Sequence, residues 1–183
     1  MRNPSPGFSL LESMIVVGIL AIVSAIAFPS FRALVEDGRA TRAANQVHAL
    51  LMAARTHAVT HQKRVTLCRT LDGETCVFGG AWSGRTIVFI DQRPNGVRDA
   101  DEPIIGHFSG PDVKPYHVVS VGHRPHIGFN PDGRMAGTNL TLRICDPRLD
   151  TRRLVVVSVS GRVRATRDVA AHPRCGNDPP SPT

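Results

Sequence analysis

The sequence contains few aromatic residues, few acidic residues and almost no lysine. Aromatic side chains make up 5% of the 183 residues, and Lys63 and Lys114 are the only lysines. Arginine therefore supplies nearly all of the positive charge, and 22 basic residues against 15 acidic ones leave a formal net charge of +7. This balance favours a phosphate-bearing or otherwise acidic partner.

The sequence also lacks the common patterns of catalysis and of metal binding. Its four cysteines do not have the CxxC spacing of zinc sites and redox motifs. No Ser-His-Asp order and no phosphate-cradling glycine loop is present, and His117, His123 and His126 are not spaced like metal ligands. We therefore predict that the protein is not an enzyme and that it holds no cofactor or metal.

What the sequence does contain is a long apolar segment near its start. Hydrophobic residues make up 42% of the chain, which argues against wholesale disorder. Residues 8–31 are almost entirely apolar, and Glu12 is their only charge. This length can cross a hydrocarbon core about 30 Å thick. A cleaved secretory signal would have a shorter apolar core that ends at small residues. A carboxylate inside such a segment is costly, so Glu12 is a functional candidate.

The residues around Glu12 carry a recognisable motif, Gly7-Phe8-Ser9-Leu10-Leu11-Glu12 followed by the apolar run. This segment resembles the class III signal of type IV pilins and pseudopilins. The resemblance implies that a prepilin peptidase cuts between Gly7 and Phe8 and N-methylates Phe8. It also implies that Glu12 pairs with the terminal amine of a neighbouring subunit during assembly. Ser13 stands where many relatives have an apolar residue.

The pattern of apolar residues predicts one long helix followed by short strands. Apolar residues recur every three or four positions from Ala40 to Ala58, so we expect a helix from about Phe8 to about His61. Pro29 and Gly38 are expected to bend this helix without ending it. The expected strands cover residues 64–68, 86–90, 104–108, 117–121, 127–129, 140–144, 154–158 and 162–165. The predicted fold class is α+β, with the helix packed on an antiparallel sheet.

Turn residues and composition set the expected boundaries. Asn130-Pro131-Asp132-Gly133 is a turn signal, and Ser160-Gly161 suggests a two-residue hairpin. We expect a leader at residues 1–7, a membrane or filament-core helix at 8–35, a head at 36–176 and a loose tail at 177–183. In the topology of a pilin, the helix anchors the protein in the bacterial inner membrane with the head in the periplasm. The head reaches the cell surface when the protein is assembled in a pilus.

Within the pilins, the head resembles the FimT and GspH group. The resemblance rests on several segments: Leu67-Cys68-Arg69, Trp82 with the strand that ends at Asp91, Phe129-Asn130-Pro131-Asp132-Gly133-Arg134, Leu142-Arg143-Ile144-Cys145-Asp146 and Gly161-Arg162-Val163-Arg164. The last of these, a Gly-Arg-x-Arg element, makes FimT the better match. FimT is a minor pilin that is linked to DNA uptake.

Arginines gather near the C-terminus and form the candidate DNA-binding site. If residues 162–165 form a strand, Arg162 and Arg164 project from one face, because side chains alternate along a strand. Arginine binds phosphate oxygens through two parallel hydrogen bonds, which suits contact with a nucleic-acid backbone. Aromatic residues for base stacking are missing here, so the segment does not support sequence-specific recognition of single strands. The alternative is a solvated edge strand that its charges protect from aggregation. The predicted binding residues are Arg162, Arg164 and Arg167, with help from Arg152, Arg153 and Arg174.

One loop has residue spacing similar to that of a calcium-binding loop. Residues 91–102 place Asn, Gly, Asp and Glu at positions five, six, nine and twelve, as in an EF-hand loop. Arg93 occupies position three, where a ligand oxygen belongs, and Pro94 stiffens the loop. A β pattern precedes the loop in place of a helix. We therefore interpret it as a turn between two strands.

The four cysteines allow three disulfide connectivities. They lie outside the membrane in the expected topology, where disulfides persist. We expect Cys68–Cys76, which closes a short loop, and Cys145–Cys175, which ties the basic tail to the sheet.

Two functions fit the sequence. The first is a FimT-like minor type IV pilin that binds DNA through its arginines and supports DNA uptake in natural transformation. The alternative is a structural minor pilin, or a GspH-like pseudopilin of type II secretion, that initiates filament assembly without binding DNA. The expected partners are DNA, other major and minor pilins, prepilin peptidase and the inner membrane.

Overall fold

The computed structural model describes residues 9–79, 82, 84–110, 116–122, 124–148, 150–167, 169 and 175. It contains one helix, α1 (Leu10–His61), followed by eight strands. The chain divides into two compact units, one ending at Gly38 and the other beginning at Arg39. The expected leader, the cleavage site at Gly7 and Phe8, the residue Arg174 and the expected tail lie outside the described residues.

The first unit is the apolar part of α1. Its large hydrophobic side chains are exposed from Leu10 to Leu34, as is Glu12. Within the described residues, α1 is the one helix that is long and apolar enough to cross a membrane, with a mean hydropathy of 2.4 over its best window. The helix continues through Pro29 and Gly38, as the sequence predicts.

The rest of α1 carries the predicted apolar stripe into the core of the second unit. The buried residues of the stripe are Ala40, Ala43, Ala44, Val47, Leu51, Ala54 and Ala58. The helix ends where Gln62 adopts a left-handed φ of 51° and the N–H of Lys63 donates to the Ala58 carbonyl at 3.2 Å. This arrangement is a Schellman-type cap, which satisfies a carbonyl that the helix itself leaves unpaired.

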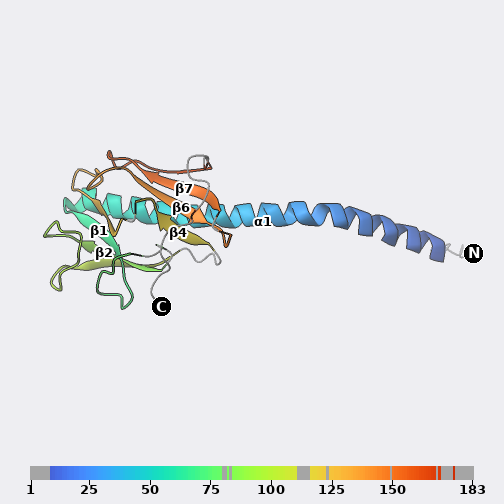
Figure 1. Cartoon of the computed structure of the whole chain (residues 1–183), viewed down its shortest axis with the longest axis horizontal. Coiled ribbons are helices and arrows are strands. Elements are labelled where there is room, and N and C mark those ends of the chain that lie inside the picture. Colours follow the sequence, from blue (N-terminus) through green and yellow to red (C-terminus); the bar gives the residue numbers. More distant parts are fainter. Residues whose placement is uncertain are drawn as a thin grey trace, which may run out of the picture. The chain divides into compact units, whose positions relative to one another are not determined.

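The eight strands form two antiparallel sheets (Figure 1). The first sheet has the order β3-β2-β1-β5, and the second has the order β4-β6-β7-β8. The strands are β1 (Val65–Arg69), β2 (Arg85–Ile90), β3 (Ile104–Ser109), β4 (His117–Ser120), β5 (His126–Phe129), β6 (Leu140–Cys145), β7 (Thr151–Val157) and β8 (Val163–Thr166).

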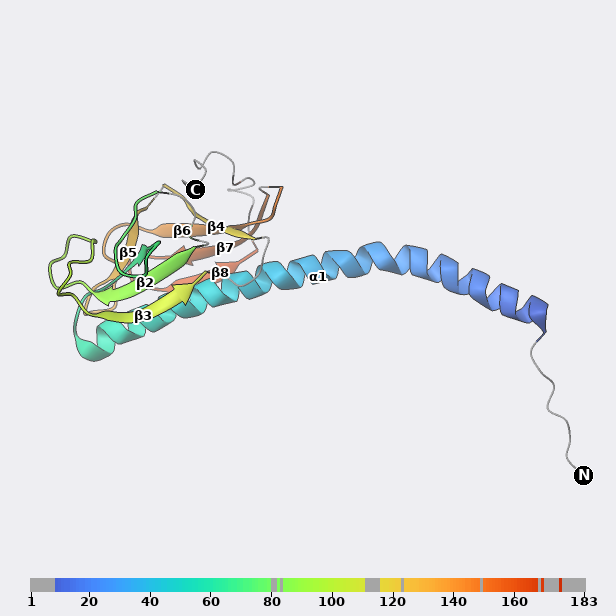
Figure 2. The ribbon, with the colours of Figure 1, turned by 90° about the horizontal axis from the view of Figure 1, so that it is seen from below.

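The predicted fold class, a long helix packed on antiparallel strands, is confirmed, and all eight predicted strands are present. Only the expectation that they form a single sheet is wrong. Eight strands about 4.8 Å apart would form a sheet roughly 34 Å wide, whereas a helix with its side chains is only about 10–12 Å across. One helix could not cover the apolar face of such a sheet. Two narrow sheets can both pack beside the same helix, and Figure 2 shows both beside this part of α1.

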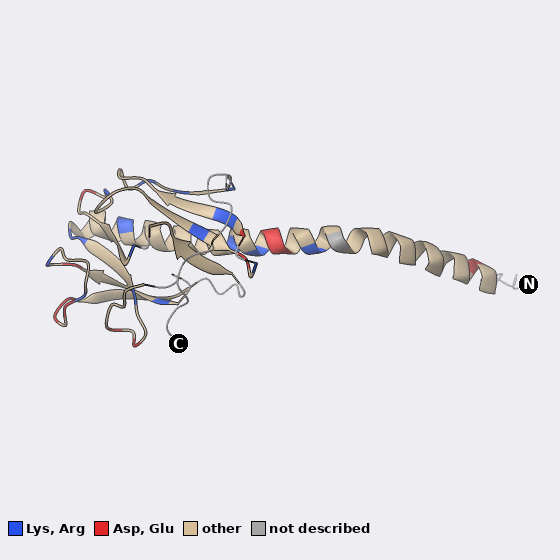
Figure 3. Ribbon diagram, viewed as in Figure 1, with Lys and Arg blue, Asp and Glu red and all other residues tan. Residues whose placement is uncertain are grey.

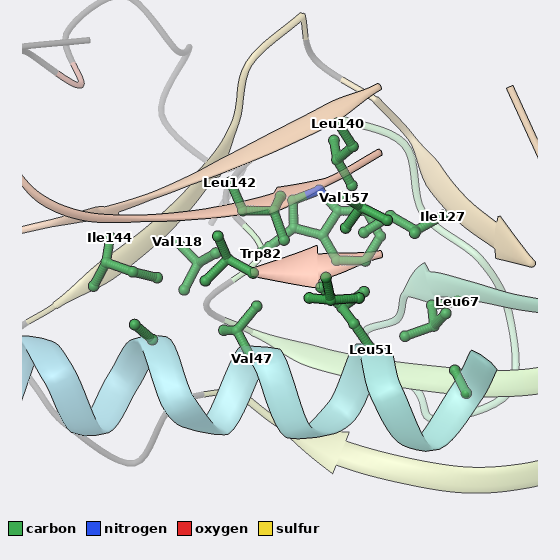
Figure 4. Close-up of a cluster of buried hydrophobic side chains, with 14 of the residues drawn as sticks. Val47, Leu51, Leu67, Trp82, Val118, Ile127, Leu140, Leu142, Ile144 and Val157 are labelled. Carbon is green, nitrogen blue, oxygen red and sulfur yellow. The ribbon is translucent and has the colours of Figure 1, made fainter. Parts of the chain in front are cut away.

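The core lies where α1 meets the two sheets. Val47 and Leu51 point from the helix toward Leu67 of the first sheet and toward Leu142 and Val157 of the second (Figure 4). All five side chains are at most 5% exposed. Because one cluster includes residues of both sheets, the second unit has a shared core.

Backbone hydrogen bonds also join the two sheets. The N–H of Met135, which forms an isolated bridge with Phe129, donates to the Val159 carbonyl at 3.0 Å. The N–H of Trp82 donates to the Val118 carbonyl of β4 at 2.6 Å.

Two disulfides connect the chain, with the pairing that the sequence suggests. Cys68 of β1 is bonded to Cys76, and Cys145 at the end of β6 is bonded to Cys175. Cys145 and Cys175 form a small buried cluster with Val119 of β4. The second disulfide thus fixes Cys175 against the second sheet.

Candidate anion-binding surface

The hairpin between β7 and β8 positions the first arginines of the site. The N–H of Gly161 donates to the Ser158 carbonyl at 2.8 Å, and the N–H of Ser158 donates to the Arg162 carbonyl at 3.0 Å. Gly161 has a φ of +78°. This pattern is a three-residue loop, a type I turn followed by a left-handed glycine. The prediction of a two-residue hairpin is therefore wrong by one residue.

Two arginines flank Val163, the first residue of β8: Arg162 ends the turn and Arg164 lies in the strand. Arg162 and Arg164 are exposed, whereas Val163 between them is 8% exposed and belongs to the core. The strand lies at the edge of its sheet, with Arg164 opposite Val156 of β7. Within the described part of the chain, neither side chain has an ion-pair or hydrogen-bond partner. Both guanidinium groups can therefore bind an anion.

The other predicted arginines have different environments. Arg152 pairs with Asp146, with 2.8 Å between Nη2 and Oδ2, and its side chain is 44% exposed. Arg153 is 7% exposed, and it donates to the Arg152 carbonyl at 2.7 Å and to Oγ1 of Thr41 on α1 at 3.0 Å. Neighbouring residues of a strand face opposite sides, which places Arg153 against the helix. Its burial and its bond to Thr41 leave Arg153 little surface for the predicted contact with DNA. Arg167 is exposed.

A second hairpin with the same geometry lies directly beside the first. The N–H of Gly133 donates to the Asn130 carbonyl at 2.8 Å, and the N–H of Asn130 donates to the Arg134 carbonyl at 2.8 Å. Gly133 has a φ of +77°. Arg134 is exposed and follows the turn glycine just as Arg162 does.

The two turns touch at their glycines. A Cβ atom on Gly161 would overlap the carbonyl oxygen of Gly133 and would lie 2.8 Å from Nε of Arg55. Nε of Arg55, from α1, donates to that same carbonyl at 2.9 Å. Arg55 therefore anchors the 130–134 turn to α1, and Gly161 of the other turn packs beside the same side chain. Neither Arg55 nor Arg134 is among the residues predicted from the sequence, although two turn glycines each followed by arginine were a usable signal.

Acidic side chains gather in a different part of the second unit. Asp72, Glu74, Asp99 and Asp101 lie in the loops that connect β1 to β2 and β2 to β3 (Figure 3). Hydrogen bonds from Thr75, Thr70 and the backbone hold the pKa of Asp72 well below its usual range. It therefore stays charged at neutral pH.

The loop at residues 91–102 supplies its own cation and hydrogen-bond donors. Glu102 is fully buried, and its carboxylate accepts the backbone N–H groups of Gln92 at 2.7 Å, Arg93 at 3.0 Å and Asp99 at 3.1 Å. Arg93 forms ion pairs with Asp99 and Asp101, which lowers the pKa of Asp101. The loop joins β2 to β3, as expected. Glu102, which would be the last ligand of a calcium site, already accepts hydrogen bonds from the backbone of the loop.

Comparison with known protein families identifies the chain. Residues 43–161 match the model of the family described as type II transport protein GspH. The chain belongs to the GspH family. Residues 2–28 of this GspH-family protein also match the prokaryotic N-terminal methylation motif. No curated protein sequence matches it significantly.

Solved structures show the same fold. The crystal structure of the type IV minor pilin FimU from Pseudomonas aeruginosa PAO1 aligns with a TM-score of 0.59 and 18% identity, covering 78% of this chain and 98% of FimU. The solution structure of Escherichia coli GspH aligns with a TM-score of 0.50 and 14% identity, covering 75% of this chain and 94% of GspH. At these identities, the structures show the pilin fold alone.

Membership of the family has direct consequences. The protein is a pilin-like member of the GspH family, a structural and non-enzymatic component. The family implies other pilins and a prepilin peptidase as partners. The apolar helix and the methylation motif are consistent with a pilin of the inner membrane.

Proposed function

We propose that this GspH-family protein is a FimT-like minor type IV pilin that binds DNA without sequence preference and supports DNA uptake in natural transformation. Arg162 and Arg164 are the central binding residues. Arg167 adds a third contact, and Arg152 and Arg174 assist. Retraction of the filament would draw the bound DNA inward.

The observation that carries this proposal is the pair of exposed arginines at the start of β8, Arg162 in the turn before the strand and Arg164 within it. Arg162 and Arg164 lie on the same side of an edge strand, and neither is neutralised by an acid within the described residues. A guanidinium group that is already paired, such as that of Arg152, has less to gain from a phosphate. Unpaired arginines can donate two parallel hydrogen bonds to phosphate oxygens, which are the same at every base pair.

The placement of the binding surface in the cell follows from the N-terminal motif. We propose that cleavage after Gly7 and methylation of Phe8 produce the mature protein. The apolar helix holds it in the inner membrane, with the head in the periplasm until assembly. Glu12 then pairs with the terminal amine of a neighbouring pilin, and the assembled head is exposed at the cell surface.

The second candidate function is assembly alone. The match to the GspH family and the fold shared with FimU favour a protein that initiates a pilus or a type II secretion pseudopilus. In that case the arginines of β8 serve only to keep the edge strand from aggregating. Direct measurement of DNA binding separates the two functions.

The test is a salt-dependent titration of unrelated duplexes with the full chain in an uncharged detergent. Three phosphate contacts predict a slope of about −2.7 for log affinity against log salt, or a roughly 40-fold loss between about 50 and 200 mM. The variant Arg162→Gln/Arg164→Gln removes two contacts and reduces the slope to about −0.9. Affinity should not depend on the duplex sequence.

The matched control is Arg85→Gln/Arg93→Gln, which removes the same charge from the first sheet and its acidic loop. It should keep the wild-type slope. If the wild-type protein has no affinity for duplex DNA even at the lowest salt concentration, the DNA-binding proposal fails and the assembly function stands.

A further inference from the structure

We infer that the phosphate-binding surface spans both sheets and that Arg134 is a further DNA contact beside Arg162. This inference rests on the proposed function and extends it to a residue on the other sheet. The surface consists of the two turns, at residues 130–134 and 158–162, and is called the paired-turn surface below.

The contact between the turn glycines brings the two arginines close together. Gly161 and the carbonyl of Gly133 approach so closely that the turns do not tolerate a Cβ at Gly161. Arg134 and Arg162 each follow one of these glycines, and consecutive Cα atoms are about 3.8 Å apart. The two arginine side chains therefore originate from adjoining points of the backbone. The N–H of Met135 donates a hydrogen bond to the Val159 carbonyl at 3.0 Å, which holds the two turns side by side.

The geometry of the paired-turn surface is fixed before any ligand binds. Both turns have the same hydrogen-bond pattern, with left-handed glycines at φ of +77° and +78°. Arg55 of α1 fastens the 130–134 turn through its bond to Gly133, and the N–H of Met135 links that turn to the Val159 carbonyl of the other. A surface that is already ordered loses less entropy on binding than a flexible tail does.

The charges also suit a phosphate backbone. Arg134 is exposed, and within the described residues its guanidinium has no ion-pair or hydrogen-bond partner. The nearest acid in sequence, Asp132, accepts the backbone N–H of Arg134 at 2.9 Å. The acidic loop between β1 and β2 leaves the opposite end of the first sheet. The loop between β2 and β3 leaves the same end as the 130–134 turn, but its Asp99 and Asp101 are already paired with Arg93. DNA that contacts Arg162 and Arg164 can therefore also meet Arg134.

The test compares Arg134→Gln with the wild-type full chain in the same salt titration. A fourth contact predicts a wild-type slope of about −3.6, and Arg134→Gln should reduce it to about −2.7. Between about 50 and 200 mM salt, Arg134→Gln should therefore lose about 3.5-fold less affinity than the wild type loses. Arg134→Lys keeps the charge and should keep the slope. Arg85→Gln is the control, since Arg85 lies at the end of the first sheet away from the turns.

The outcomes separate this inference from the proposed function. If Arg134→Gln binds like the wild type while Arg162→Gln/Arg164→Gln loses slope, Arg134 is not a contact and the proposed function stands. If Arg134→Gln and Arg85→Gln weaken binding equally, the effect is one of net charge and the inference fails. If the wild type does not bind DNA, both fail.

Discussion

At the scale of single residues, Gly161 is under two independent constraints. Its φ of +78° lies in the left-handed region, which costs a residue with a Cβ roughly 1–2 kcal/mol. It also packs against the Gly133 carbonyl, so a Cβ would overlap backbone, which cannot move as a flexible side chain can. The glycine of the Gly-Arg-x-Arg element is therefore structural, and only its arginines are left for binding.

We predict that Gly161→Ala destabilises the second unit by about 2–5 kcal/mol, which combines left-handed strain with the roughly 1–3 kcal/mol of a forced contact. Gly122 is the matched control, because its φ is +79° and nothing lies within 4 Å of the position that a Cβ would take there. Gly122→Ala should cost only about 1–2 kcal/mol. Urea unfolding followed by the fluorescence of Trp82, the only tryptophan, measures both. Equal losses would show that contact between the turns imposes no constraint.

The arginines show which residue-level features the sequence could predict. Arginine and valine alternate at positions 162–164 of the sequence, and this alternation predicts that Arg162 and Arg164 are exposed. Arg152 and Arg153 are consecutive, and alternation alone says that they face opposite sides without saying which is buried. That choice depends on the register of β6 with β7, which shifts between Ile144 and Cys145. Arg134 shares the Gly-Arg step of Arg162, which was a usable signal, but nothing local in the sequence shows that the two turns touch.

At the scale of elements, the disulfides stabilise segments of different length. Cys145–Cys175 joins residues 30 apart and encloses β7, its hairpin and β8. Cys68–Cys76 joins residues 8 apart and closes one loop after β1. The binding strand β8 therefore lies inside the larger of the two loops.

We predict that Cys145→Ala/Cys175→Ala lowers the free energy of unfolding by about 3.6 kcal/mol, and Cys68→Ala/Cys76→Ala by about 2.5 kcal/mol. The reason is that a longer closed loop restricts the unfolded chain more. Urea unfolding without reductant, followed by Trp82, measures both variants. A larger loss from the shorter loop would contradict this order and would assign the stabilisation to contacts in the folded protein.

The sequence predicted elements better than their association. Hydrophobic periodicity located α1 and all eight strands, because each signal is local. The division into two sheets was missed, since it depends on how many strands a single helix can cover. The hairpin at 158–162 was misjudged by one residue because Ser160-Gly161 is compatible with two loop lengths, and the bond from Gly161 to Ser158 decides between them.

At the scale of the whole molecule, assembly and binding depend on different parts of the chain. The apolar part of α1 and Glu12 belong to one compact unit, and the paired-turn surface belongs to the other. The core, both disulfides and both turns lie in the second unit. A change at Glu12 should therefore leave the DNA-binding surface intact.

We predict that Glu12→Gln reduces incorporation of the protein into filaments at least roughly tenfold and leaves its affinity for DNA unchanged. A carboxylate in the membrane costs about 2.5–3.5 kcal/mol on insertion scales, and an ammonium from a neighbouring subunit relieves that cost. Glutamine has no charge to pair, so docking loses a driving force of this size, and each 1.4 kcal/mol corresponds to about a tenfold change. The measurement compares the amount of protein in sheared filaments with duplex binding by the same purified variant.

Ser13→Ala is the control for Glu12→Gln, because Ser13 is the next exposed residue of the same helix and carries no charge. It should enter filaments as the wild type does. If Glu12→Gln is incorporated normally, Glu12 is not the assembly acid, and the cost of its carboxylate must be relieved within its own subunit. If Glu12→Gln loses DNA affinity in detergent, the two units are coupled, and binding cannot be attributed to the arginines of the second unit alone.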